Sequence, residues 1–290
     1  MDINVAVVCR AKMYAETRRK LGWWSYPVPD LNWTFYPVAD GETINKNKLA
    51  KAGHDLIVWE DWCWPTWDGT SAIPIYAVMV DSNTSPRRRK LYLERAQSAD
   101  VLLVDQDRLT PFRVTGRPIY RWQYAVNEQV FAPQPKDIDV AYHVEHTPER
   151  ATLHGPLVSF CRERGLSLTT GGGLTIDQYA VRLGSARIVV HKATHEQCRS
   201  HRFFDALASG ACLLSDRVWT VPEDGFVPGQ HFSWWETPGD LFSRLEHLLT
   251  TGRWQPIALA GQAFVLARHT WRTRAAELVM ITGERQGKRA

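Results

Sequence analysis

The sequence predicts an α/β protein of two domains with largely parallel sheets. Short apolar runs alternate with helical patterns along the chain, and this alternation is typical of parallel βαβ units. A length of 290 residues is too long for one ordinary core and too short for three. Residues 129–137 contain two prolines and little periodicity, so they predict a linker near the middle of the chain.

The first half contains four apolar runs that predict strands and one helical pattern. The strands are expected at residues 5–8, 56–59, 75–80 and 101–104, and the helix at residues 88–97. We expect these elements to form a Rossmann-like domain over residues 1–133.

The second half repeats the alternation of strands and helices. Gly165 and Gly210 stand where helix C-caps belong. Residues 134–265 are therefore expected to form a second Rossmann-like domain. Its strands are expected at 140–144, 188–191 and 211–214, and its helices at 148–164, 175–184, 199–209 and 239–249, with a last helix at 257–281 and a frayed tail at 283–290.

The composition is that of a globular protein, with 44% hydrophobic and 23% charged residues and a net charge of +4. The sequence contains no run of roughly 20 apolar residues, and its first residues do not resemble a signal peptide. We therefore expect a cytoplasmic monomer without a membrane partner. Five scattered cysteines without a C-x-x-C pair argue against a disulfide framework and a structural zinc site, and predict buried, reduced thiols.

The densest motif is the run from Arg199 to Asp216, RSHRFFDALASGACLLSD, in which a helix ends at a glycine and leads into a strand. Arg202 and Asp205 are three residues apart, so they project from the same face of this helix. A carboxylate there can accept both hydroxyls of a ribose, while the guanidinium and the helix N-terminus can bind a diphosphate. The alternative is an ordinary surface ion pair before a tight turn.

This run resembles the R-x-F-E-A-L-A-x-G signature of GT-B glycosyltransferases, particularly the CgeB-like and group 1-like chains, with Asp205 in place of glutamate. Residues 122–132, 226–232, 257–261 and 269–275 resemble further family segments in the same order, so the likeness covers residues 120–275. The family's glycine after the first strand of the second domain is absent, because residues 142–146 read YHVEH.

The resemblance implies a GT-B fold with a donor site in residues 134–265, an acceptor site in residues 1–133 and a cleft between the domains. It also implies that the C-terminal helix, residues 266–290, packs back on the N-terminal domain. By position, Arg202 would bind the diphosphate and Asp205 the ribose of a UDP-sugar, UDP-glucose in the first place. Lys192, His143, His146 and Arg150 would line the phosphates or the sugar, although Arg150 and Lys192 are more simply explained as solvated residues and one histidine as structural.

Sugar transfer to a hydroxyl also calls for a base, and carboxylates follow three strands of the first half. Asp61 and Asp81 are the favoured candidates, with Glu60 beside Asp61, because they precede irregular loops. Each is otherwise a turn or N-cap carboxylate. Asp105-Gln106-Asp107 matches the short D-x-D metal motif of the GT-A fold, but the longer GT-B resemblance implies no essential metal and no cofactor beyond the donor substrate.

The acceptor is predicted from aromatic and basic residues of the first half. Trp62, Trp64 and Trp67 follow Trp59 within nine residues, and Arg87, Arg88 and Arg89 occupy a helix start, where cations oppose the helix dipole unless phosphates bind. Double-stranded DNA with 5-hydroxymethylpyrimidine bases is therefore the preferred acceptor, and this combination resembles the phage DNA glucosyltransferases. The alternatives are a polysaccharide, protein or small-molecule acceptor, and an inactive nucleotide-sugar-binding or DNA-binding module.

Overall fold

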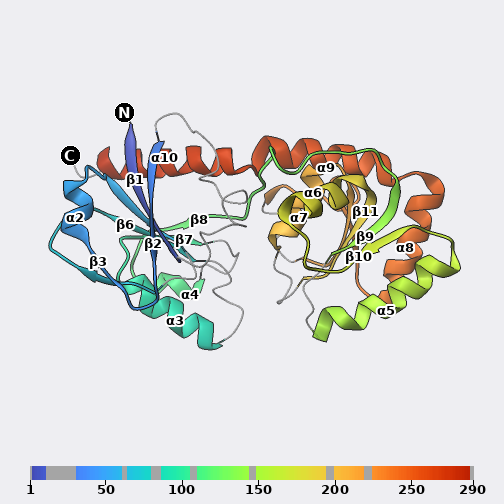
Figure 1. The fold of residues 1–290 in the computed structure, drawn as a ribbon, viewed down its shortest axis with the longest axis horizontal. Helices are drawn as coiled ribbons and strands as arrows, with labels where there is room; N and C mark the ends of the chain where they lie inside the picture. Colours follow the sequence, from blue (N-terminus) through green and yellow to red (C-terminus); the bar gives the residue numbers. More distant parts are fainter. Residues whose placement is uncertain are drawn as a thin grey trace. The chain divides into compact units, whose positions relative to one another are not determined.

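The computed structural model describes residues 2–10, 31–60, 64–79, 86–104, 110–143, 148–193, 199–218 and 224–287. The chain divides into two compact units. The first contains Met1–Gln123 together with Trp271–Ala290, and the second contains Tyr124–Thr270. Figure 1 shows that each unit is built around its own sheet.

The first unit contains a six-stranded sheet in which every neighbouring pair is parallel. Its central strands are buried on both faces, which is why they read as unbroken apolar runs in the sequence. The strand order is β2 (Leu31–Val38), β1 (Ile3–Arg10), β4 (Leu56–Trp59), β6 (Ile75–Met79), β7 (Val101–Val104) and β8 (Ile119–Arg121), and β3 (Thr43–Asn45) pairs with β5 (Thr66–Asp68) in a small separate sheet. The helices are α2 (Lys46–Lys51), α3 (Pro86–Gln97), α4 (Thr110–Arg113) and the C-terminal α10 (Trp271–Gly287).

The second unit contains a five-stranded parallel sheet with helices on both faces. Its order is β10 (Leu168–Thr170), β9 (Ile138–Tyr142), β11 (Ala186–His191), β12 (Cys212–Asp216) and β13 (Ser233–Trp235). The helices are α5 (Pro148–Glu163), α6 (Ile176–Ser185), α7 (His201–Ala208), α8 (Pro238–Thr251) and α9 (Trp254–Arg268). The predicted glycine caps are confirmed, because Gly165 and Gly210 have φ angles of 64° and 66°.

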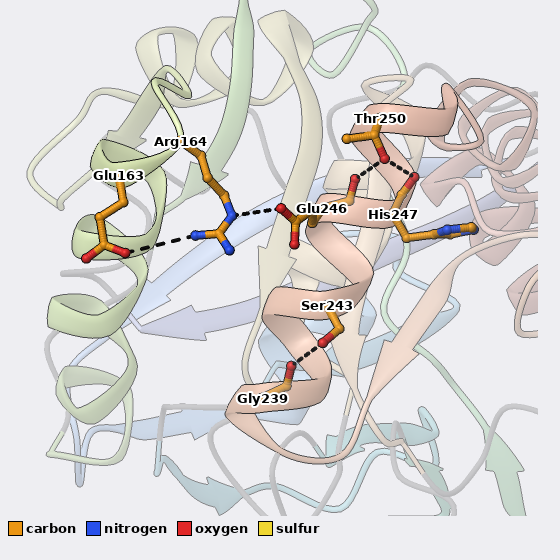
Figure 2. A network of polar contacts seen from close by, with 7 residues as sticks. All are labelled: Glu163, Arg164, Gly239, Ser243, Glu246, His247 and Thr250. Atoms are coloured by element: carbon orange, nitrogen blue, oxygen red, sulfur yellow. Dashed lines mark hydrogen bonds and ion pairs between the residues drawn. The ribbon is translucent and has the colours of Figure 1, made fainter.

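Helices α5 and α8 lie side by side against one face of this second sheet (Figure 1). Leu157 from α5 and Leu245 from α8 are fully buried in the same core cluster as Val140 and Ile188 of the sheet. At the surface, Arg164 Nε donates to Glu246 Oε1 at 3.1 Å and so bridges the two helices (Figure 2). Both side chains are more than one-third exposed, so the buried leucines and not this ion pair hold the helices in place.

The predicted single helix over residues 257–281 is wrong, because the chain forms α9 and α10 with a break at His269 and Thr270. At the break, the carbonyl of His269 accepts a hydrogen bond of 2.9 Å from Val126 N, and Thr270 forms a β-bridge with Val126. The strands β2, β3, β5, β8, β10 and β13 were not predicted. Several are short or only half-buried, so they lack the apolar run that marks the central strands.

Candidate functional site

The candidate site lies at the carboxyl ends of the strands of the second unit. The strand order reverses direction at β9, which has β10 on one side and β11 on the other. Ligands of open parallel sheets bind where such a reversal leaves a crevice beyond the strand ends. His143 follows β9, Gly171 follows β10 and Lys192 follows β11, so these three positions meet at that edge.

His143 is buried, with 4% of its surface exposed. Its Nδ1 lies 3.0 Å from the carbonyl oxygen of Gly171, which can only accept, so Nδ1 donates. Nε2 lies 3.2 Å from the hydroxyl of Thr169. Burial lowers the pKa of His143, the positive charges of Arg202 and Arg182 lower it further, and the Gly171 carbonyl partly opposes the shift. The side chain is therefore an uncharged imidazole at neutral pH, beside two arginines.

Helix α7 carries the two residues on which the motif depends. Phe203, Phe204 and Leu207 are buried against the unit's interior and fix the rotation of the helix. Arg202 is half-buried, and its Nε and Nη1 atoms are inaccessible to solvent and lack a hydrogen-bond partner within the described part of the chain. An unsatisfied guanidinium of this kind is expected where an anionic group completes the site.

Asp205 is 4% exposed and lies close enough to Arg202 for the two charges to interact. Burial raises the pKa of Asp205 well above its usual range, and the charge of Arg202 opposes that shift. The carboxyl group is therefore largely desolvated beside a positive charge, and a hydrogen-bond donor at its exposed edge would stabilise its charged form.

Lys192 and Asp216 form a polar pair beyond β11 and β12. Lys192 Nζ lies 3.3 Å from Asp216 Oδ2, and Asp216 Oδ1 accepts from the backbone N–H of Ala193 at 2.8 Å. Burial alone would raise the pKa of Asp216, but the hydrogen bond and charge of His191, the Ala193 N–H and Lys192 together lower it. Lys192 is thus an ion-paired residue at the edge of the site.

Two further predicted donor residues are not placed. His146 lies outside the described residues, and Arg150 belongs to the first turn of α5, where the structure describes the backbone but not its side chain. Sequence reasoning missed Arg182, Thr169, Gly171 and Asp216 as neighbours of the site. Asp216 carried a usable signal, because it directly follows an apolar strand inside the quoted motif.

In the first unit, the strand order reverses at β1, which lies between β2 and β4. Glu60 follows β4 at that edge, and its backbone N–H donates to the carbonyl oxygen of Val8 at 2.9 Å. Arg95 is 3% exposed and donates to the carbonyl oxygens of Trp59 at 2.8 Å and of Glu60 at 2.6 Å. The buried Arg95 therefore fixes the backbone at the strand end, an anchor that the sequence did not reveal. Asp61, Asp81, Asp105 and Trp62 lie outside the described residues.

Trp64 and Trp67 are half-buried and pack on buried aromatic side chains of the first unit. Trp67 packs edge-to-face on Trp59 with ring centroids 5.3 Å apart, and Trp64 packs on Tyr92 at 6.0 Å. The guanidinium of Arg95 lies 4.0 Å from the Trp59 ring centroid. Part of each ring is therefore used for packing. Arg87, Arg88 and Arg89 lie in the first turn of α3, which contains no acidic residue, and their side chains are not described.

None of the helices in the described segments is long and apolar enough to cross a bilayer. No group of three or more His, Cys, Asp or Glu side chains among the described residues is arranged to hold a metal ion, and Asp105 and Asp107 do not belong to these residues.

The chain matches the model of the family described as "Glycosyl transferase-like" over residues 102–280. No curated protein sequence matches the chain significantly.

Three solved structures resemble the whole chain at low sequence identity. Sucrose-phosphate synthase from Thermosynechococcus elongatus superimposes with a TM-score of 0.66 at 11% identity, over 99% of this chain and 100% of that one. HepE from Anabaena, in complex with UDP-glucose, gives a TM-score of 0.64 at 11% identity, over 97% of this chain and 100% of that one. A protein from Listeria monocytogenes described as a putative UDP-N-acetylglucosamine 2-epimerase gives 0.59 at 11% identity, over 100% and 98%. At such identities the likeness establishes the fold, which is GT-B.

Proposed function

Because the chain belongs to the Glycosyl transferase-like family and is a glycosyltransferase of the GT-B fold, we propose that it binds a UDP-sugar as donor. The first candidate is UDP-glucose. The observation that carries the proposal is the half-buried Arg202, whose Nε and Nη1 lack partners within the described residues, one turn before the buried Asp205. A nucleoside diphosphate offers partners to both groups, because its phosphates accept hydrogen bonds from the guanidinium and its ribose hydroxyls donate them to the carboxylate.

Transfer requires that the negative charge that develops on the leaving diphosphate be neutralised. Arg202 and Arg182 supply positive charge near His143, and the N-terminus of α7 adds the positive end of a helix dipole. We assign Arg202 to the diphosphate and Asp205 to the ribose, with Lys192, His143, His146 and Arg150 lining the phosphates or the sugar. This assignment needs no metal ion for the leaving group.

The donor assignment is tested by UDP and UDP-glucose binding with isothermal titration calorimetry. Asp205→Ala should weaken binding about ten-fold or more, because it removes the acceptor of the ribose hydroxyls. Asp177→Ala is the matched control, since Asp177 is a carboxylate in the first turn of the neighbouring helix α6. Equal affinities of wild type and Asp205→Ala would refute the ribose assignment.

We further propose that the acceptor is a 5-hydroxymethylpyrimidine base in double-stranded DNA. What supports this is the start of α3, where Arg87, Arg88 and Arg89 lie in a first turn without an acidic residue. Cations there oppose the helix dipole, and bound DNA phosphates would offset that cost. Trp62, Trp64 and Trp67 would offer stacking surface, and Asp61, Asp81 or Glu60 would take the proton of the attacking hydroxyl.

The acceptor proposal is tested by incubating the protein with UDP-glucose and a duplex containing 5-hydroxymethylcytosine, followed by nucleoside mass analysis with and without EDTA. A mass gain of one hexose that persists in EDTA is the expected result. Hydrolysis of UDP-glucose without a mass gain in DNA would point to a polysaccharide, protein or small-molecule acceptor. Loss of activity in EDTA would instead implicate Asp105 and Asp107 in metal binding.

A further inference from the structure

Ser200 occupies the N-cap position of α7 but does not cap the helix. Its backbone is extended, with φ −102° and ψ 171°, as in an N-cap residue, yet its side chain forms no hydrogen bond with the first turn. Three other N-cap residues of the chain behave in the usual way: Asn45, Thr175 and Thr237 each accept from the backbone N–H three residues later, at 3.1–3.2 Å. The missing cap hydrogen bond of Ser200 therefore has a local cause.

The cause is His191, at the end of β11, which is fully buried. Its Nε2 lies 3.0 Å from the Ser200 hydroxyl, and its Nδ1 lies 2.9 Å from the Ser215 hydroxyl. Ser215 donates its own proton to the carbonyl of Asp216, so its oxygen accepts from His191 Nδ1. Nδ1 also lies 3.6 Å from Asp216 Oδ1, which likewise favours a proton on this nitrogen. In the neutral ring Nε2 accepts from the Ser200 hydroxyl, and in the charged ring Nε2 donates to it, so the bond to Ser200 exists in both states. The imidazole is thus held from β12 and in turn holds Ser200.

We propose that His191 is a positioning residue of the donor site: by binding the Ser200 hydroxyl, it keeps this side chain out of the first turn of α7 and leaves that turn open to the diphosphate. The inference rests on the proposed donor site. A serine released from His191 would take up the usual cap position, and a phosphate would then have to displace it. Arg202 projects from the same first turn, so the capping serine and the phosphates would compete beside it.

The test compares UDP affinities of full-length variants. His191→Leu removes the hydrogen bond while keeping an apolar side chain of similar size, and should weaken UDP binding about five-fold, which corresponds to a typical cap of ~1 kcal/mol. In His191→Leu with Ser200→Ala no hydroxyl is left to cap the helix, so UDP affinity should return to within about two-fold of wild type. If His191 only stabilised the fold, adding Ser200→Ala to His191→Leu would not restore UDP affinity.

His54→Leu is the matched control, because His54 also binds a hydroxyl through Nε2, that of Tyr36 at 2.8 Å, but lies in the first unit. It should leave UDP affinity unchanged. Wild type that does not bind UDP would overturn the proposed donor site itself. Wild type that binds UDP, together with a double variant that stays as weak as His191→Leu, would overturn only the role of His191.

A second pair of variants covers the case in which His191→Leu does not fold. Ser200→Asn introduces a strong capping side chain, whereas Ser200→Ala introduces none, and both lose the hydroxyl that binds His191. Ser200→Asn should bind UDP about five-fold more weakly than Ser200→Ala. Equal affinities of these two variants would also overturn the proposal.

Discussion

Gly261 in the middle of α9 is predicted to be required for stability, although it is a glycine inside a helix. A Cβ at this position would lie 2.1 Å from the backbone oxygen of His231, about 1.3 Å inside the 3.4 Å at which ordinary contact begins. It would also lie 2.8 Å from Leu207 Cδ2, on α7. The first neighbour is backbone and cannot rotate away, so Gly261→Ala has to displace α9 or the turn at His231.

The expected magnitude follows from two opposing terms. Alanine in place of glycine inside a helix contributes about 1 kcal/mol through propensity. Overpacking a closed interior costs about 1–3 kcal/mol and occasionally more, and here the full displacement falls on packed backbone. We therefore expect Gly261→Ala to lower the free energy of unfolding by about 2 kcal/mol, which in a chain of this size lowers Tm by roughly 4–8 °C.

Gly155→Ala is the matched control. Gly155 lies inside α5 of the same unit, and a Cβ there would meet nothing within 4 Å apart from its chain neighbours. The propensity gain of about 1 kcal/mol is opposed only by Pro156, which disfavours a side chain on the helical residue before it, so this variant should lie within about 1 kcal/mol of wild type. Thermal unfolding followed by far-UV circular dichroism measures both variants. A Gly261→Ala protein as stable as Gly155→Ala would show that the close approach of α9 to His231 does not exist in solution.

Three further predictions concern buried titratable groups. Burial lowers the pKa of Lys136 to about 8, so wild type should gain stability as the pH rises from about 8 towards ~10.4, and Lys136→Met should lack this gain in thermal melts at pH 7, 9 and 10. Because burial raises the pKa of Asp205, ionising this carboxyl costs more in the folded chain than in the unfolded chain, and wild type should lose stability as the pH rises above ~4. Asp205→Asn carries no such charge, so its Tm relative to that of wild type should increase between about pH 4.5 and about 7.5 in the same assay; a Tm difference that does not change with pH would contradict this. Burial raises the pKa values of Cys9, Cys161 and Cys212 to about 12, 11 and 12, so peptide mass mapping should find them unlabelled by iodoacetamide at pH 8 unless the chain is unfolded.

The sequence predicted the central strands and the motif helix because both depend on local patterns. The runs at 56–59 and 101–104 are buried strands, as four consecutive apolar residues bounded by polar ones indicate. Arg202 and Asp205 lie on the same face of α7, because residues three positions apart are neighbours on a helix surface. The break between α9 and α10 could not be predicted in this way, because it depends on the pairing of Thr270 with Val126, more than 140 positions earlier in the sequence.

The pairing of the residues around the site could not be predicted from the sequence for the same reason, although Asp216 carried a local signal. His143 meets Thr169 and Gly171 only because β9 and β10 pair in parallel, and Lys192 meets Asp216 only because β11 and β12 do. The anchor Arg95 gave no signal, because in the sequence it is one of many arginines on a helix, whereas in the structure it donates to two carbonyls at the end of β4.

Helix α7, which carries the proposed donor residues Arg202 and Asp205, is fixed at both of its ends by side chains that the proposed ligand would not touch. At the C-terminal end, Gln262 Nε2 donates to Ala208 O at 2.9 Å and Lys136 Nζ donates to Ser209 O at 3.2 Å, while the close approach at Gly261 keeps α9 against Leu207. At the N-terminal end, His191 holds Ser200. A helix so constrained cannot adjust when one restraint is lost, because tightly packed interiors transmit displacements. Substitutions at α9 or in the segment around Lys136 should therefore appear as weaker nucleotide binding as well as lower stability, although none of these residues would contact the donor.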